Sequence, residues 1–198
     1  MLIGVTGFKR SGKDSIGNIL HVHAGFSRFA FADRMKDFAL ALDPFIPVME
    51  APPSPLLVGV RPEMPPQYQR LTTIVQDFGW EIAKENPEIR RFLQRLGTEG
   101  GRRILGVNIW VDALQMTKLP EQSVITDVRF LNEAAAVQAC GGKVWRVVRP
   151  GSDMTDTHPS EQELRSIQED VTIQNDGTLE DLVDAVLSAL KDRALKSV

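Results

Sequence analysis

Short apolar runs alternate with helical patterns at both ends of the chain. The first run is Leu2–Thr6, and in the segment 16–22 that follows it apolar residues recur at helical spacing. Further strands are expected over 26–31, 123–126, 143–148 and 171–173, and further helices over 33–42 with Asp33 as N-cap, over 131–139 and over 178–195. Short apolar strands separated by helices predict an α/β fold with a parallel sheet covered by helices, because parallel connections need a crossover.

The middle of the chain has a different pattern. Eight of the twelve prolines lie between Pro44 and Pro66, where each removes a backbone donor and disfavours helix at the residue before it. This stretch is predicted to be irregular, either as a functional excursion or as a simple surface insertion. From Gln67 to Lys118 the pattern is helical, with no strand signal. We therefore predict one domain over residues 1–198, in which 44–118 form a proline-rich loop and a mainly helical, substrate-covering insertion.

Composition narrows the class of protein. The chain has 198 residues, 42% of them hydrophobic and 25% charged, which fits one globular domain with a substantial core. Its net charge of −3 gives no general reason to expect binding to a nucleic acid polymer. A membrane partner is not expected, since no apolar stretch approaches the roughly 20 residues needed to cross a bilayer. With Cys140 as the single cysteine and no secretory pattern, a cytoplasmic location is expected.

A glycine-rich segment lies between the first predicted strand and the first predicted helix. Residues 7–14 read GFKRSGKD and fit the pattern G-x-x-x-x-G-K of a phosphate-binding loop. Glycines let successive N–H groups turn toward an anion, and the helix start adds partial positive charge. Lys13 can then reach the β- and γ-phosphates of a nucleotide. The alternative is an ordinary glycine turn beside a solvated lysine, although Lys9 and Arg10 add charge that such a turn does not need.

The metal ligand beside this loop is ambiguous. Asp14 occupies the position usually held by Ser or Thr, and the hydroxyl of Ser15 follows one residue later. A further carboxylate, Asp127, ends the strand VITD, where open α/β sheets bind their ligands. Asp127 is predicted to hold magnesium directly or through water, with a helix N-cap or an acidic loop residue as the alternative.

Arginines follow the later strands and fill the middle of the chain. Arg129 is expected to contact a phosphoryl oxygen or to form a surface ion pair. The polar stretch 156–161 after Arg149 is expected to close over phosphates as a lid. A further set of side chains would share one face of a helix, namely Arg91, Gln94, Arg95 and Thr98. This face is expected either to bind a monophosphate and the edge of a base or to be simply solvated.

With these residues in place, the chain resembles phage-type deoxynucleoside monophosphate kinases, a branch of the P-loop nucleoside monophosphate kinases. The resemblance rests on FKRSGKDS, RRFLQRLGTE followed by NIWV, TDVRFLNEAAAVQACGGKVWRVVRPG, DTH and IQNDGTLEDL, which together cover about half of the chain. It implies the P-loop kinase fold and transfer of the γ-phosphoryl group of ATP to a deoxynucleoside 5′-monophosphate with Mg²⁺ as cofactor.

The resemblance also implies a set of site residues. The catalytic residues would be Lys13, Asp127 and Arg129, and the magnesium ligands would come from Asp14, Ser15 and Asp127. The ATP-binding residues would be Gly7, Lys9, Arg10, Ser11, Gly12, Lys13, Asp14, Ser15, Arg149, Asn175 and Gly177, with Asn175–Gly177 beside the adenine. The acceptor nucleotide would contact Lys36, Arg91, Gln94, Arg95, Thr98 and Trp110.

Two other functions fit the same loop. One is a kinase for a different small molecule, similar to dephospho-coenzyme A kinase, which shares the loop and the NDG-type ending. The other is a nucleotide-dependent switch without transferase activity. Partners beyond ATP and the deoxynucleotide are limited to a possible second copy of the chain, since the apolar positions of the helical middle are suited to a dimer face.

Overall fold

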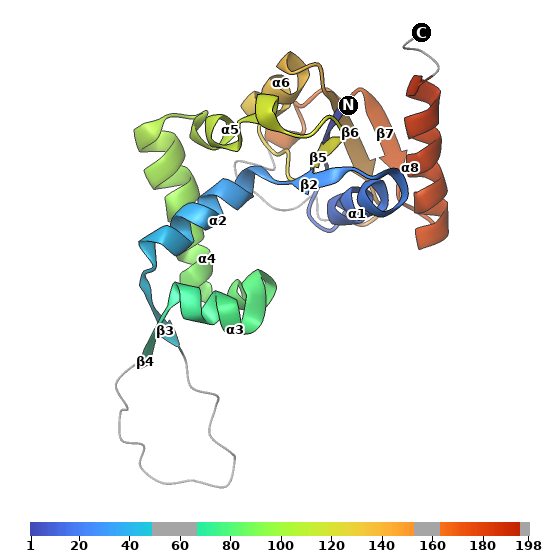
Figure 1. Ribbon diagram of the computed structural model, residues 1–198. Coiled ribbons are helices and arrows are strands. Elements are labelled where there is room, and N and C mark those ends of the chain that lie inside the picture. The colour runs from blue at the N-terminus through green and yellow to red at the C-terminus, as the bar shows by residue number, and fades with distance from the viewer. Residues whose placement is uncertain (49–66, 153–162, 195–198) are drawn as a thin grey trace, which may run out of the picture. The chain divides into compact units, whose positions relative to one another are not determined.

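The computed structural model describes residues 1–48, 67–152 and 163–194 (Figure 1). The predicted lid at 156–161 and most of the proline-rich stretch lie outside these residues. The chain divides into two units, one formed by Met1–Arg34 with Val107–Val198 and the other by Met35–Gly106. The second unit begins and ends earlier than the predicted insertion over 44–118.

The first unit is built on a five-stranded sheet. Its strands are β1 (Leu2–Thr6), β2 (Ser27–Phe29), β5 (Ser123–Ile125), β6 (Lys143–Val148) and β7 (Val171–Gln174). They lie in the order β2-β5-β1-β6-β7, and every neighbouring pair is parallel. The predicted parallel sheet is confirmed, and its central strand is the one that leads into the glycine-rich loop. The carboxyl ends of all five strands therefore meet at one edge, where α/β sheets bind ligands.

Helices cover both faces of this sheet, as predicted. Within the described residues this unit includes the following helices: α1 (Lys13–Ala24), the start of α2 (Phe31–Leu42), α5 (Ile109–Leu114), the short η2 (Met116–Lys118), α6 (Leu131–Ala139) and α8 (Leu179–Ala194). On one face α1 and α8 lie side by side, and their apolar residues join a core around Trp145 (Figure 1). On the other face α5 and α6 contribute Leu114 and Val137 to a second core. Burial of these two sets of side chains stabilises the sheet between them.

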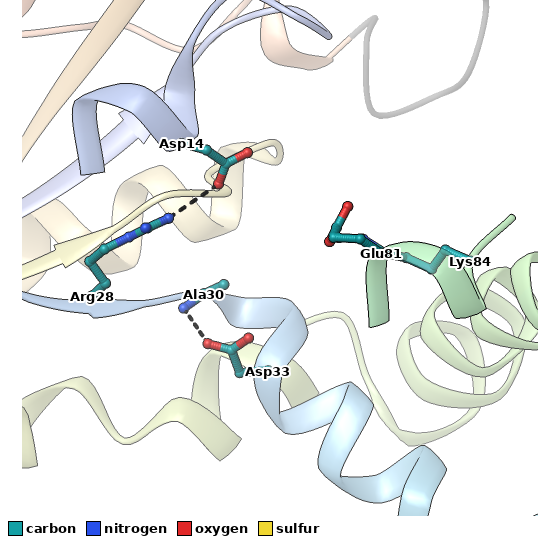
Figure 2. Close-up of polar contacts among 6 residues, drawn as sticks. All are labelled: Asp14, Arg28, Ala30, Asp33, Glu81 and Lys84. Atoms are coloured by element: carbon teal, nitrogen blue, oxygen red, sulfur yellow. Dashed lines mark hydrogen bonds and ion pairs between the residues drawn. The ribbon is translucent and has the colours of Figure 1, made fainter. Parts of the chain in front are cut away.

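The start of α2 differs from the prediction. Asp33 was expected to be the N-cap, yet the helix begins two residues earlier, at Phe31. Figure 2 shows Asp33 inside the first turn, where its carboxylate accepts a hydrogen bond from the Ala30 amide at 2.8 Å. The helix starts earlier because a distant carboxylate, Asp127, accepts the first two helical amides. Local sequence cannot signal such a contact.

The second unit contains a hairpin that the sequence did not predict. Strand β3 (Phe45–Val48) pairs antiparallel with β4 (Gln67–Arg70), where the pattern indicated an irregular loop and then a helix. All four side chains of β4 are exposed, so no apolar alternation marks this strand. Pro47 is tolerated because a two-stranded ribbon has open edges that need no further N–H donors.

The rest of the second unit is helical. It comprises the end of α2, α3 (Leu71–Ala83), α4 (Pro87–Gln94) and a π-helix, η1 (Arg95–Leu105). Its core is formed by Ala39, Ile46, Leu71, Ile74, Ala83, Ile89 and Leu93. Because α4 ends at Gln94 and the π-helix has i→i+5 hydrogen bonds, the 3.6-residue period does not continue to Thr98. The predicted helical face therefore includes Arg91 and Gln94, but it does not extend regularly to Thr98.

Within the described residues, every helix is too short or too polar to cross a lipid bilayer.

Candidate functional site

The glycine-rich loop follows the central strand and has the backbone of an anion-binding loop. Gly7 and Gly12 have φ angles of 152° and 110°, and Arg10 has a φ of 64°. These are positive values that glycine adopts without strain and other residues rarely adopt. The Ser11 amide donates to the Phe8 carbonyl at 3.1 Å, which closes a turn inside the loop. The loop ends at the first turn of α1, whose N-terminal amides favour an anion.

Lys13 spans the loop. Its ammonium group donates to the carbonyl oxygens of Gly7 at 2.7 Å and Phe8 at 2.8 Å. The positive charge is thus held at the mouth of the loop by two charge-assisted hydrogen bonds. The role that the sequence predicts for this lysine, contact with the β- and γ-phosphates, stays a prediction.

Asn175 contacts the same loop from the other end of the chain. It follows β7, and its side-chain amide donates to the Ser11 carbonyl at 2.8 Å. A Cβ atom placed on Gly12 would lie 2.5 Å from the Asn175 amide nitrogen, so glycine is required there for packing as well as for its φ angle. Gly177, expected with Asn175 beside the adenine, lies two residues further, and a Cβ there would lie 2.5 Å from the Asp181 carboxylate.

Two predicted magnesium ligands, Asp14 and Ser15, lie at the start of α1 beside the loop. Asp14 lies in the first turn of α1, and its exposed carboxylate pairs with Arg28 of β2 at 3.5 Å (Figure 2). Ser15, half-buried, follows it. Among the described residues no three His, Cys, Asp or Glu side chains form a cluster that would hold a metal by themselves.

Asp127 is located at the carboxyl end of β5, as predicted, and it caps a helix. Its two carboxylate oxygens accept hydrogen bonds from the amides of Phe31 at 2.7 Å and Ala32 at 3.0 Å. Burial raises the pKa of Asp127, whereas these amides and the charge of Arg129 act in the opposite direction. Asp127 therefore caps α2 from a distant position in the sequence, whereas the N-cap of the helix that follows it, α6, is Phe130. Its role as a magnesium ligand stays a prediction.

The other predicted residues of the first unit differ in exposure. Arg129 and Arg149 are exposed and follow β5 and β6, so both lie at the carboxyl edge of the sheet. Trp110, which was expected to contact the acceptor, is only 6% exposed within α5. Glu133, in the first turn of α6, is buried and accepts hydrogen bonds from the amides of Arg129 and Phe130 at 2.8 and 3.2 Å. It thereby fixes the backbone that carries Arg129.

One further cation near the loop was missed by the sequence analysis. The guanidinium of Arg165 lies 5.9 Å from the centre of the Phe8 ring, within the range of a cation–π contact. Arg146 of β6 holds the following turn, since it donates to the carbonyls of Leu164 at 3.1 Å and Ile167 at 2.5 Å. No local pattern identifies Arg165, because its neighbourhood with Phe8 depends on the fold.

The second unit carries most of the predicted acceptor residues. Arg91 and Arg95 line a cavity of about 530 Å³ between β3 and the helices α4 and η1. Each is paired with a glutamate of its own helical segment, Arg91 with Glu88 at 2.9 Å and Arg95 with Glu99 at 3.4 Å. Gln94 and Thr98 are exposed on the same segment. The structure therefore brings two arginines together at one cavity, without showing what binds there.

Lys36 belongs to the same unit through α2. It is half-buried, and its charge contributes to lowering the pKa of Glu81, although hydrogen bonding and charge from Lys84 contribute more. Glu81 and Lys84, at the end of α3, are joined at 2.7 Å; Figure 2 shows both residues.

Known proteins are similar to this chain in sequence, and solved structures are similar to it in fold. The deoxynucleotide monophosphate kinase family matches residues 60–186. A putative deoxynucleotide monophosphate kinase of Acanthamoeba polyphaga mimivirus is 30% identical, with 96% of each chain covered. The deoxynucleotide monophosphate kinase of Escherichia phage RB69 is 32% identical over 52% of this chain and 45% of its own length. Among solved structures, shikimate kinase from Aquifex aeolicus superposes with a TM-score of 0.50 and 15% identity, covering 98% of this chain and 99% of that one.

A parallel sheet whose central strand leads into this loop, together with these neighbours, defines the chain as a P-loop kinase. Within that class, the chain belongs to the deoxynucleotide monophosphate kinase family.

Proposed function

We propose that this protein transfers the γ-phosphoryl group of ATP to a deoxynucleoside 5′-monophosphate and releases the diphosphate and ADP. The observation that carries the proposal is the loop from Gly7 to Gly12, with its positive φ angles and with Lys13 held at its mouth. Membership of the deoxynucleotide monophosphate kinase family supports the choice of acceptor.

The residues of this chain supply charge and alignment. Backbone amides of the loop bind the phosphates of ATP, and Lys13 exchanges its two carbonyl partners for phosphate oxygens. Arg129 and Arg149, exposed at the carboxyl edge of the sheet, neutralise charge on the transferred group. Phosphoryl transfer depends mainly on positioning and electrostatic stabilisation, so no strong base is required.

Magnesium fits this set of donors. Carboxylate and hydroxyl oxygens are its preferred protein ligands, and Asp14 and Ser15 offer one of each in the first turn of α1. Asp127 would act through water, because both of its oxygens already accept amide hydrogen bonds. When bound, the ion supplies positive charge that offsets the negative charge of the phosphates.

The residues proposed to bind the acceptor nucleotide belong to the second unit. There Arg91 and Arg95 line one cavity together with apolar side chains such as Phe92 and Leu96. Arginine pairs well with a monophosphate, and apolar walls accept the face of a base. We assign this cavity to the deoxynucleoside monophosphate, with Gln94, Thr98 and Lys36 as further contacts.

The test is a coupled transferase assay with Lys13→Ala and, as a matched control, Lys191→Ala on the exposed surface of α8. We expect the Lys13 variant to fold normally and to lose about a hundredfold or more in kcat, the size of effect seen when one strong transition-state donor is removed. The control should retain normal turnover. Unchanged kcat in the Lys13 variant would contradict the role of the loop.

A panel of acceptors separates the competing functions. Phosphorylation of at least one deoxynucleoside monophosphate supports the proposal. Transfer to a coenzyme precursor but to no deoxynucleotide would replace it with the alternative that resembles dephospho-coenzyme A kinase. Binding of ATP without affinity for any monophosphate would favour a nucleotide switch, and calorimetric titration with a deoxynucleotide in the absence of ATP distinguishes this outcome directly.

A further inference from the structure

The turn between β7 and α8 touches the glycine-rich loop through one side chain. Asn175 reaches across to the Ser11 carbonyl at 2.8 Å and fills the space next to Gly12. From this contact we infer that Asn175 is a positioning residue for the phosphate loop, and that its side chain acts on the triphosphate through the loop backbone and not on the adenine. This inference deepens the proposed function and rests on it.

The hydrogen bond from Asn175 fixes the orientation of the peptide between Ser11 and Gly12. In a planar trans peptide the carbonyl and the following N–H point in opposite directions. Because the Ser11 carbonyl is directed at Asn175, the N–H of Gly12 is directed away from it. A free rotation of this peptide would turn the amide away from an anion, and the hydrogen bond from Asn175 opposes that rotation.

Asn175 is itself held from both sides, so it can transmit this constraint. Its own amide donates to the Val148 carbonyl at 2.8 Å, which extends the pairing of β7 with β6 by one residue. On the other side, Thr178 and Asp181 form a capping box at the start of α8, with hydrogen bonds of 2.8 and 3.2 Å between each backbone amide and the other side chain. The turn therefore has little freedom to move away from the loop.

The packing at Gly12 supports the same role. Nothing larger than hydrogen fits between the Gly12 backbone and the Asn175 amide, since an added Cβ would come within 2.5 Å of it. Val147 of β6 lies against the same glycine at 3.9 Å from the Cβ position. Gly12 is thus enclosed by Asn175 and Val147, and loss of the asparagine side chain would leave the loop free on that side.

The inference predicts a specific pattern of binding. A residue that reads adenine affects ATP alone, whereas a residue that orients the loop affects every ligand bound through its phosphates. Inorganic tripolyphosphate has no base, and GTP has a different one. We therefore expect Asn175→Ala to weaken binding of ATP, GTP and tripolyphosphate by the same factor, about tenfold, the size of one well-placed hydrogen bond.

The experiment is calorimetric titration of the three ligands into the full chain, with Gln174→Ala as the matched control. Gln174 is the neighbouring amide residue, and its side chain is exposed. Asn175→Asp serves as the second variant, since it keeps the side-chain shape and lacks the donor, and it should weaken all three ligands at least as strongly. Thermal unfolding of each variant verifies that it is folded at the titration temperature.

Each outcome has a defined meaning. Equal losses for the three ligands in both Asn175 variants, with normal binding in the control, support the inference. A loss confined to ATP, with tripolyphosphate bound normally, overturns it in favour of contact with the base, and unchanged binding of all three ligands also overturns it. If the wild-type chain binds neither ATP nor tripolyphosphate, the phosphate loop itself is misassigned and the proposed function fails first.

Discussion

Removal of the Asp127 carboxylate tests whether this side chain is a helix cap. In Asp127→Ala the amides of Phe31 and Ala32 lose their acceptors, which lie at 2.7 and 3.0 Å. Each amide left without a partner costs about 1–3 kcal/mol, so the two together cost about 2–6 kcal/mol, and we expect about 3 kcal/mol. For a chain of this size that loss lowers Tm by about 9 °C.

The assay is thermal unfolding combined with hydrogen exchange at the two amides. Asp184→Ala, on the exposed surface of α8, is the control for the same change of residue type. Exchange should accelerate at Phe31 and Ala32 in the Asp127 variant alone. A Tm equal to that of the control, with exchange unchanged at both amides, would refute the capping role.

The pH dependence of Asp127→Asn tests the charge of the same group. Burial raises the pKa of Asp127 above 3.8; Asp33 adds to this, while the amides of Ala32 and Phe31 and the charge of Arg129 oppose it. A carboxyl whose pKa is raised by folding stabilises the folded state fully below pH 3.8, and this contribution is lost as the pH rises through the folded pKa. The free energy of unfolding of the wild type should therefore fall relative to that of Asp127→Asn as the pH increases. A difference that grows with pH would contradict this sign.

Three further changes test the local structure. Gly17→Ala should lower the free energy of unfolding by about 1–2 kcal/mol in denaturant titrations, because the added Cβ meets the Thr126 methyl group. Thr126→Ser in the same chain should recover most of this loss. Additive effects of the two changes would argue against direct contact. Hydrogen bonds from Thr178 lower the pKa of Asp181, so the contribution of this carboxylate to stability is present above pH 3.8 and is lost as the pH falls through the folded pKa. In Asp181→Asn the free energy of unfolding should therefore fall less at acidic pH, and an unchanged pH dependence would exclude this role. Asn86→Ala should destabilise the second unit by about 1 kcal/mol, because the Asn86 side chain caps α4 by accepting from the Glu88 amide at 2.9 Å. Asn86→Asp keeps this acceptor and should lose less. Equal losses would point to the other hydrogen bond of Asn86, which its side-chain amide donates to the Pro47 carbonyl.

The sheet of the first unit was predictable because buried parallel strands are continuous apolar runs. The segment Leu2–Thr6 carries that signal, and the helix Leu131–Ala139 was predicted with its observed limits. The hairpin of β3 and β4 lacks the signal, since its second strand exposes all four side chains. Hydrophobic patterns in the sequence predict only those strands and helices that bury an apolar face.

The candidate site divides in the same way. The glycine-rich loop is local, so its sequence predicts its conformation. The roles of Asp127 and Asn175 depend on contacts with residues 96 and 164 positions away, and no local pattern distinguishes a metal ligand from a helix cap at the end of a strand. Arg91 differs in this respect, because its partner Glu88 lies three residues earlier on the same helix.

The most direct test of the account is a single-turnover reaction that follows the γ-phosphoryl group of labelled ATP in the presence of each deoxynucleoside monophosphate. We predict that the label moves to at least one deoxynucleoside diphosphate with the wild-type chain, and that this transfer is lost in Lys13→Ala. Label that stays on ATP or appears only as inorganic phosphate with every acceptor would contradict it.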